Sequence, residues 1–216
     1  MFITFEGMDG SGKTTQVGAT AAYLRERGYD VLLTREPGGT EIGDQIRELL
    51  LNKDGVEIAP NTELLLFCAS RAQLVESVIR PHLKRGGVVI SDRYTDSSIA
   101  YQGYGHGIDI DVLHTLLDFA TGRLYPDLTL FLDISPQVSL QRRAAGSLFG
   151  EEWSRIDAMA IAFHERVYAG YQAIGQRETG RWVSVNADQA QADVEAEILA
   201  VLEARLSQAA QRESKT

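Results

Sequence analysis

The chain has little cysteine, no long apolar run and no surplus of positive charge. Its 216 residues include one cysteine, Cys68, so a disulfide within the chain is excluded. Cys68 lies in the apolar stretch 64–69, where we expect a small buried side chain rather than a catalytic thiol. No apolar run approaches the roughly 20 residues that cross a bilayer, and the first residues show no signal-peptide pattern. These features favour a reducing, cytoplasmic setting and predict no membrane partner.

The charge balance is acidic, with 21 Lys and Arg residues against 30 Asp and Glu residues and a net charge of −9. Proteins that bind DNA or RNA usually carry a basic surplus, so we expect no nucleic-acid polymer as partner. The length suits one domain with a sizeable core. We expect this domain over residues 1–208 and a disordered tail over 209–216.

Residues 7–14 match the pattern G-x-x-x-x-G-K-[ST], which marks a phosphate-binding P-loop. Glycines let successive backbone N–H groups point into one hollow, and the following helix adds partial positive charge at its N-terminus. Lys13 can reach the β- and γ-phosphates of a nucleotide, and the Thr14 hydroxyl can bind Mg²⁺. The predicted ATP-binding residues are Gly7, Met8, Asp9, Gly10, Ser11, Gly12, Lys13, Thr14 and, later in the chain, Arg142.

Apolar runs typical of buried strands alternate with longer runs typical of amphipathic helices. This alternation predicts an α/β fold with a parallel sheet. We expect strands at 2–5, 31–34, 88–91, 128–133 and 181–185. We expect helices at 14–27, 40–51, 61–79, 108–122, 136–144, 155–176 and 191–208, and a partly helical segment facing a ligand at 95–107.

Cations recur where the predicted strands end, although the chain is acidic overall. Lys13, Arg35 and Arg93 follow the first three strands, and Arg142 and Arg143 end the helix after the fourth. Ligands of parallel α/β sheets bind at this edge. The P-loop, its lysine and Mg²⁺ already serve one triphosphate, so the extra arginines predict a second ligand with its own phosphate. A surface ion pair is the alternative for each arginine taken alone.

An acceptor phosphate would simplify the chemistry, because its oxygen is already anionic at neutral pH. A kinase acting on such an acceptor needs no base, and catalysis is then positioning and charge neutralisation. Arginines in excess of candidate bases fit this mechanism. Asp92, at the end of the third strand, lies where an acid could hold Mg²⁺ through water.

Several motifs resemble those of bacterial thymidylate kinases. They are the P-loop segment 5–15, the segments Thr34-Arg35-Glu36-Pro37-Gly38-Gly39-Thr40 and Asp92-Arg93-Tyr94, and the short segments 97–98, 100–103 and 126–129. The resemblance runs from about residue 2 to about residue 205. It implies phosphoryl transfer from ATP to dTMP, which yields dTDP for dTTP synthesis, and it implies Mg²⁺ and a homodimer. The implied fold is a P-loop NTPase of nucleoside-monophosphate-kinase type, a five-stranded parallel sheet flanked by helices on both faces, with a short lid.

The resemblance also implies roles for individual residues. Arg93, with Arg35 near it, would grip the dTMP phosphate, and Asp9 would contact the 3′-hydroxyl. Phe67 would stack on thymine, and Arg71, one helical turn later, would bond to the edge of the base. From the residues alone, core packing is the alternative for Phe67. The remaining pocket residues are Ser98, Tyr101, which would disfavour a ribose, and Gln102.

Thymidylate kinases carry a catalytic arginine either in the P-loop or in the lid. Residues 8–11 contain no arginine, so the resemblance implies the lid type, with a lid at about 143–155. Ser154-Arg155-Ile156-Asp157 resembles the end of that lid, which favours Arg155 as the catalytic arginine and places Arg143 second. Residues 144–153 depart from the arginine-rich lid that is common in the family.

Other functions compatible with a P-loop are a kinase for another nucleotide or a deoxynucleoside, a switch or motor, and a non-catalytic nucleotide-binding module. A GTPase needs an Asn-Lys-x-Asp motif, which Asn186-Ala187-Asp188-Gln189 does not match. A motor ATPase usually shows an acidic pair after an apolar strand, whereas the third strand here ends in Asp92-Arg93. A binding module would not require Lys13, Thr14 and the arginines together.

The lid assignment makes a first prediction. Arg155→Ala should lower kcat about 10³-fold with little change in the KM for dTMP, because an arginine that stabilises the transferring phosphoryl group acts mainly in the transition state. Steady-state kinetics with varied dTMP measure both constants. An unchanged kcat would reject the assignment.

Overall fold

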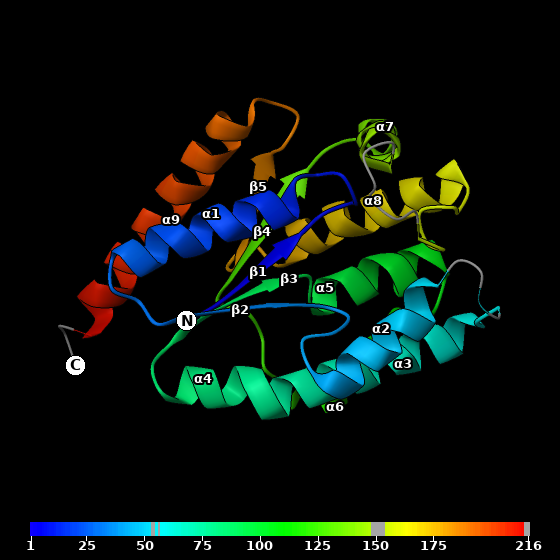
Figure 1. Cartoon of the computed structure of the whole chain (residues 1–216), viewed down its shortest axis with the longest axis horizontal. Coiled ribbons are helices and arrows are strands. Elements are labelled where there is room, and N and C mark those ends of the chain that lie inside the picture. Colours follow the sequence, from blue (N-terminus) through cyan, green and yellow to red (C-terminus); the bar gives the residue numbers. More distant parts are fainter. Residues whose placement is uncertain (53–54, 56, 148–153, 214–216) are drawn as a thin grey trace.

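A computed structural model of the chain describes residues 1–52, 55, 57–147 and 154–213. Its centre is a sheet of five parallel strands in the order β2-β3-β1-β4-β5 (Figure 1). The strands are β1 (Phe2–Glu6), β2 (Val31–Arg35), β3 (Val88–Asp92), β4 (Leu128–Asp133) and β5 (Trp182–Asn186). The predicted five-stranded parallel sheet is therefore confirmed. Because β1 lies between β3 and β4, the P-loop leaves from the middle of the sheet.

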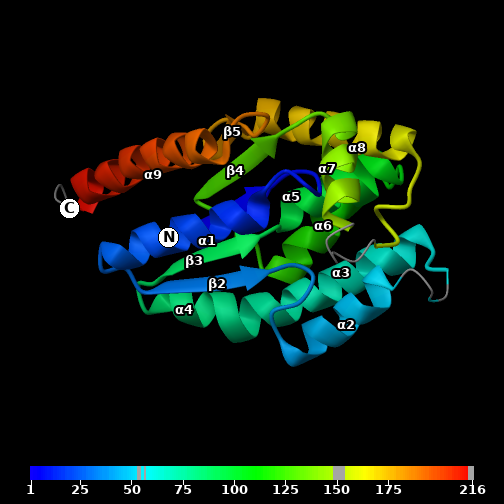
Figure 2. The same cartoon turned by 45° about the horizontal axis from the view of Figure 1, so that its top comes forward.

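Helices cover both faces of this sheet, as predicted. On one face lie α1 (Lys13–Glu26) and α9 (Gln191–Glu213); in both views α7 (Pro136–Ser147) lies beyond the arrowheads of the strands (Figures 1 and 2). The remaining α-helices do not lie on the face covered by α1 and α9. They are α2 (Glu41–Leu51), α3 (Pro60–Leu74), α4 (Arg80–Lys84), α5 (Thr95–Ser98), α6 (Ile110–Thr121) and α8 (Ile161–Arg177). Two π-helical segments, η1 (Val75–Ile79) and η2 (Ile99–Gly105), continue α3 and α5.

Strand side chains alternate between two cores, as the period-2 geometry of a strand requires. Ile3 and Phe5 pack with residues of α1 and α9. Phe2 points to the opposite face, where its ring meets Tyr94 edge-on at 4.9 Å. Cys68 is buried in the core beneath α3, α6 and α8, which confirms the structural role predicted for it. No helix in the described part of the chain is long and apolar enough to cross a membrane.

Three helix boundaries differ from prediction by five residues or more. The helix expected to end at residue 79 continues past Pro81, because the wider turns of η1 precede it and the proline falls in the first turn of α4, where no N–H is needed. The helix expected from 155 begins at Ile161, after a turn in which Asp157 accepts hydrogen bonds from Ser154 N and Oγ, both at 2.8 Å. The last helix extends to Glu213, so the boundary predicted at 208 falls inside it.

Candidate active site

The P-loop has a backbone that demands glycine. Gly7, Gly10 and Gly12 have φ angles of 140°, 81° and 90°, which side chains other than glycine rarely adopt. A Cβ atom at Gly7 would lie 2.8 Å from Leu132 O, and one at Gly10 would lie 2.8 Å from Ser139 O. The loop is thus packed tightly between β4 and α7, which holds its N–H groups in a fixed arrangement.

Lys13 and Thr14 project from the first turn of α1 into the same region. The buried Lys13 Nζ donates to Gly7 O at 3.1 Å and to Met8 O at 2.9 Å. Burial and the neighbouring Arg93 together lower the pKa of Lys13. Thr14 Oγ1 donates to Asp92 Oδ2 at 3.1 Å, so the two predicted magnesium ligands are adjacent.

Two cavities meet beside the P-loop. An open cleft runs along the P-loop and the end of β2, and a smaller cavity of about 140 Å³ lies between α3, η2 and the turn at 154–157. Five residues line both of them and form their common wall: Asp9, Glu36, Arg47, Arg93 and Arg143. Three guanidinium groups therefore lie at the junction, where they would stabilise negative charge on a group that passes from one cavity to the other.

Arg93 is fixed on all sides at this junction. Its φ angle of 74° is unusual for a residue with a side chain. Its Nη2 donates to Asp9 Oδ1 at 2.8 Å, and its Nη1 donates to Ser97 Oγ at 3.0 Å and to Tyr171 Oη at 3.1 Å. Desolvation raises the pKa of Asp9, but the charges of Arg93 and Lys13 outweigh it and hold that pKa well below its usual range. Asp9 is thus a carboxylate that stands between the two cations.

The smaller cavity has an aromatic wall and a buried cation. Phe67 is half-buried and lines the cavity, which makes core packing a poor account of this residue. Arg71 is 1% exposed; its Nε donates to Glu36 Oε2 at 2.7 Å and its Nη1 to Ser98 Oγ at 3.0 Å. Tyr101 also lines this cavity, with its ring centroid 5.1 Å from the Arg93 guanidinium carbon. The five residues predicted from 67 to 102 for the base and sugar pocket, Phe67, Arg71, Ser98, Tyr101 and Gln102, all line this one cavity.

A buried carboxylate, Glu63, organises the side of the cavity near α3. It accepts hydrogen bonds from Gln102 Nε2 at 2.8 Å and from Arg155 Nη2, and its Oε1 lies 3.3 Å from His106 Nε2. Burial raises its pKa, but the bonds from His106, Arg155 and Gln102 outweigh burial and lower the pKa to about 2. Arg155 is therefore paired with a residue of α3. Leu50 O, at the end of α2, accepts a second hydrogen bond from Arg155 at 3.4 Å.

The other predicted cations occupy different places. Arg143 lines both cavities and its Nε donates to Asp157 Oδ2 at 3.2 Å. Arg142 lines the open cleft, where it donates to Ala187 O at 2.8 Å and pairs with Asp188 at 3.0 Å. Arg35 lines the open cleft together with Arg93, 3.5 Å from Asp44, but does not line the smaller cavity. The predicted lid includes residues 148–153, which lie outside the described residues.

Four residues of the site were missed from the sequence: Glu36, Arg47, Glu63 and Tyr171. Glu36 lies within a recognised motif, but nothing in the motif shows that it pairs with Arg71. Arg47 donates to Pro37 O at 3.0 Å from the second turn of a helix that carries no motif. Glu63 and Tyr171 act through partners at least 39 residues away, so no local spacing could reveal them.

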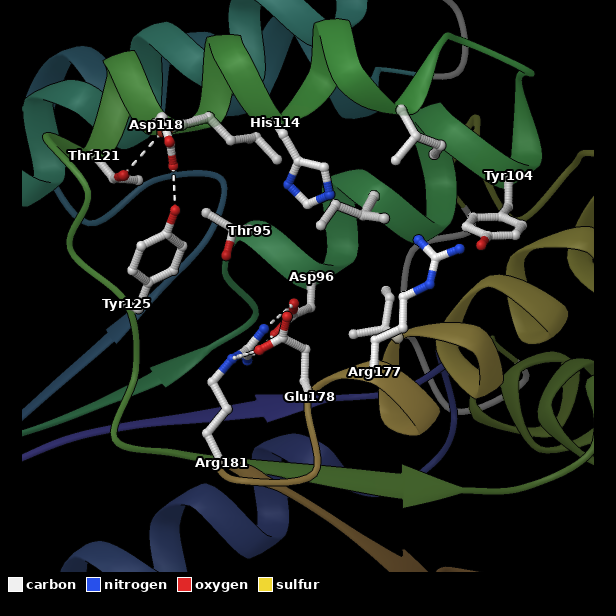
Figure 3. A pocket seen from close by; sticks show the side chains of 14 residues that line it. Thr95, Asp96, Tyr104, His114, Asp118, Thr121, Tyr125, Arg177, Glu178 and Arg181 are labelled. Carbon is white, nitrogen blue, oxygen red and sulfur yellow. Dashed lines mark hydrogen bonds and ion pairs between the residues drawn. The ribbon is translucent and has the colours of Figure 1, made fainter.

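A separate cavity of about 260 Å³ lies on the other side of α5 and η2 (Figure 3). Asp96 Oδ2 accepts a bond from Arg181 Nη1 at 2.6 Å there, and Tyr104 and Tyr125 stand near two ends of the group of side chains. No P-loop residue lines this cavity, so it is remote from the phosphate site.

The fold and the site together define a class. A parallel sheet with a P-loop after its central strand, and a second cavity that shares an arginine-rich wall with the P-loop cleft, is the arrangement of a P-loop kinase that acts on a phosphorylated acceptor. A model of the family described as thymidylate kinase matches residues 5–198. The chain belongs to the thymidylate kinase family.

Individual relatives agree along almost the whole chain. The thymidylate kinase of Roseiflexus castenholzii is 46% identical over 223 residues, which cover 99% of this chain and 97% of the relative. That of Thermomicrobium roseum is 52% identical over 186 residues, 86% of each chain. A crystal structure of thymidylate kinase from Ehrlichia chaffeensis is 36% identical, with a TM-score of 0.75, and covers 94% of this chain and 98% of that one.

The Glu63 cluster makes a pH-dependent prediction. Its folded pKa of about 2 lies below the ordinary 4.5, so its contribution to stability is complete above about pH 4.5 and is lost as the pH falls toward 2. Glu63→Gln should therefore lower the free energy of unfolding at pH 7 by about 2 kcal/mol, the scale of hydrogen bonds to a charged group, and the gap to wild type should narrow below pH 4.5. Urea unfolding at several pH values measures it.

The matched control for this variant is Glu76→Gln, which removes an exposed Glu–Arg pair. We expect this change to cost under about 0.5 kcal/mol. A pH-independent gap for Glu63→Gln would show that the charge of Glu63 contributes nothing.

Proposed function

We propose that this chain phosphorylates dTMP to dTDP with ATP as donor, with the open cleft as the ATP site and the smaller cavity as the dTMP site. The observation that carries the proposal is the wall of Asp9, Glu36, Arg47, Arg93 and Arg143 that the two cavities share. These side chains line the junction of the two cavities, so a phosphoryl group that leaves one cavity there enters the other directly. The family of the chain supports the choice of substrates.

The residues present fit a magnesium ion bound mainly by nucleotide and water. In the described part of the chain, no three His, Cys, Asp or Glu side chains form a cluster suited to a metal. Thr14 and Asp92 supply two neighbouring oxygen ligands, and Mg²⁺ typically takes one or two protein ligands together with substrate phosphates. When bound, the ion would neutralise charge on the β- and γ-phosphates of ATP.

In the proposed dTMP site, each side chain contacts a different part of the substrate. Phe67 offers its ring to the face of thymine, and Arg71, held by Glu36 and Ser98, offers its guanidinium to the edge. Arg93 binds the acceptor phosphate. Asp9, beside it, accepts a hydrogen bond from the 3′-hydroxyl group. The acceptor phosphate is then an anionic nucleophile, positioned toward the P-loop without any base.

We further propose that Arg143 supplies the charge that stabilises the transferring phosphoryl group. Arg143 lines both cavities, whereas Arg155 is paired with the buried Glu63 at the far side of the dTMP site. Asp157 orients Arg143 from the turn after the lid. In this arrangement Arg155 shapes the dTMP pocket and does not reach the phosphates.

A homodimer is also proposed, built on the face formed by α2, α3 and α6. Helices α2 and α3 pack side by side, as do α3 and α6, and all three carry large apolar side chains that are exposed to solvent, which is the composition expected of an interaction surface. The set consists of Ile42, Leu49, Leu65, Val112 and, 88% exposed, Phe119.

The ATP-dependent reaction suits the cytoplasmic setting predicted from cysteine content.

The substrate assignment is tested by coupled measurement of ADP release from ATP. Among dTMP, dUMP, dCMP, AMP and thymidine, dTMP should give the highest kcat/KM. A higher kcat/KM with another monophosphate, or with thymidine, would reject dTMP as the substrate.

Replacing the two lid arginines separately tests the catalytic assignment. Arg143→Ala should lower kcat about 10³-fold and leave the KM for dTMP nearly unchanged. Arg155→Ala should instead raise the KM for dTMP about 10-fold, because it removes the arginine partner of the buried Glu63 beside the base pocket. Steady-state kinetics of both variants decide between the assignments. A 10³-fold loss of kcat in Arg155→Ala alone would return the role to Arg155.

A further inference from the structure

Glu6 is a fully buried carboxyl group that the proposed reaction does not use. It ends β1, immediately before the P-loop, with none of its surface exposed. Burial raises its pKa to about 7; the nearby Asp96 adds to this shift and Arg93 opposes it. A carboxyl group in the centre of a sheet is costly unless its hydrogen bonds are satisfied, so its partners indicate what it does.

Its partners are the groups that surround Arg93. Glu6 Oε1 accepts a hydrogen bond from the backbone N–H of Tyr94 at 2.8 Å. Glu6 Oε2 accepts from Ser97 Oγ at 2.6 Å and from Tyr171 Oη at 3.1 Å. Ser97 and Tyr171 come from α5 and α8, so one carboxyl group joins a strand, the turn after β3 and two helices.

These bonds decide the direction of the hydroxyl hydrogens. A hydroxyl group has one hydrogen and two lone pairs. When Glu6 is ionised, Ser97 and Tyr171 both point their hydrogens at it, so both hydroxyl oxygens keep lone pairs for Arg93 Nη1, which lies 3.0 Å from Ser97 Oγ and 3.1 Å from Tyr171 Oη. Arg93 Nη2 donates to Asp9 Oδ1 at 2.8 Å. The guanidinium is thereby oriented toward the wall between the cavities.

We propose that Glu6 is a positioning residue for Arg93, which acts through the hydroxyl groups of Ser97 and Tyr171. Glu6 touches neither cavity, but it holds the backbone after the strained Arg93 and polarises both oxygens that receive its guanidinium. The proposal rests on the proposed role of Arg93 as the residue that binds the acceptor phosphate.

Glu6→Gln reverses this polarity with little change in shape. The amide oxygen can still accept the Tyr94 N–H, and the amide NH₂ then faces Ser97 and Tyr171. Both hydroxyl groups must accept from it, so their hydrogens turn away from residue 6. One of them can bridge the 3.0 Å between Ser97 Oγ and Tyr171 Oη, and the other turns toward the N–H groups of Arg93. Tyr171→Phe tests the same path by removing one hydroxyl group and adding no donor.

The experiment compares a ligand with the acceptor phosphate and one without it. Dissociation constants for dTMP and thymidine are measured by calorimetry on wild type, on the single variants Glu6→Gln, Tyr171→Phe and Arg93→Ala, and on the double variant that combines Glu6→Gln with Arg93→Ala. Glu6→Gln and Tyr171→Phe should weaken dTMP about 10-fold, the effect of one hydrogen bond to a charged group, and change thymidine affinity less than about 2-fold. In the Arg93→Ala background, Glu6→Gln should not weaken dTMP binding any further, because the effects of residues that act through one another are not additive.

Tyr168→Phe is the matched control for Tyr171→Phe. Tyr168 lies on the same helix, and its hydroxyl group donates to a carboxylate, Asp133, at 2.9 Å. This variant should bind both ligands as wild type does, so a general effect of removing a tyrosine hydroxyl group from α8 is excluded.

The outcomes separate the inference from the proposed function. If Arg93→Ala leaves dTMP affinity unchanged, the acceptor-phosphate role of Arg93 fails. If Arg93→Ala weakens dTMP but Tyr171→Phe and Glu6→Gln do not, that role stands and the positioning role of Glu6 is wrong. Equal loss of dTMP and thymidine affinity would also overturn it, because that pattern indicates a general loosening of the fold. Should Glu6→Gln fail to fold, Tyr171→Phe alone decides.

Discussion

The site depends on holding several positive charges close together in a partly buried space. Arg47, Arg93 and Arg143 share one wall, and Lys13 lies beside them. Such a group repels itself unless each member has an oxygen partner. Asp9, Asp157 and the Pro37 carbonyl supply those partners, yet none neutralises the wall as a whole. Positive potential therefore remains directed into both cavities, ready for two phosphate-bearing ligands whose charges would otherwise keep them apart.

The parts that hold these charges differ in their place relative to the sheet. Asp92 ends β3 and Arg93 follows it directly, and Lys13 begins a helix packed on the sheet. Arg143 and Arg155 flank the proposed lid and reach the site from the chain between β4 and α8. The groups proposed to bind ground-state phosphate thus belong to the sheet edge and to the helix packed on it. The group proposed to act in transfer belongs to a segment outside it.

Local patterns allowed much of this molecule to be predicted. Strand and helix periodicity and the P-loop spacing predict the sheet, the phosphate site and the order of elements, because these depend on neighbours in sequence. The i, i+4 spacing of Phe67 and Arg71 likewise predicts a shared face. Partner choice among distant residues has no such signature: Glu6 and Tyr171 are 165 positions apart, and Arg155 and Glu63 are 92 apart. Tertiary packing alone brings these together, which is why the partners of the arginines could not be read beforehand.

The central position of β1 has a consequence for how the chain matures. Ile3 pairs with Ile90 on one side and with Leu128 on the other. At synthesis rates of roughly 5–20 residues per second, the first strand leaves the ribosome about ten seconds before its second partner exists. The P-loop strand is therefore among the first parts of the chain to be made, but it is flanked by both of its neighbours only after β4 has been synthesised.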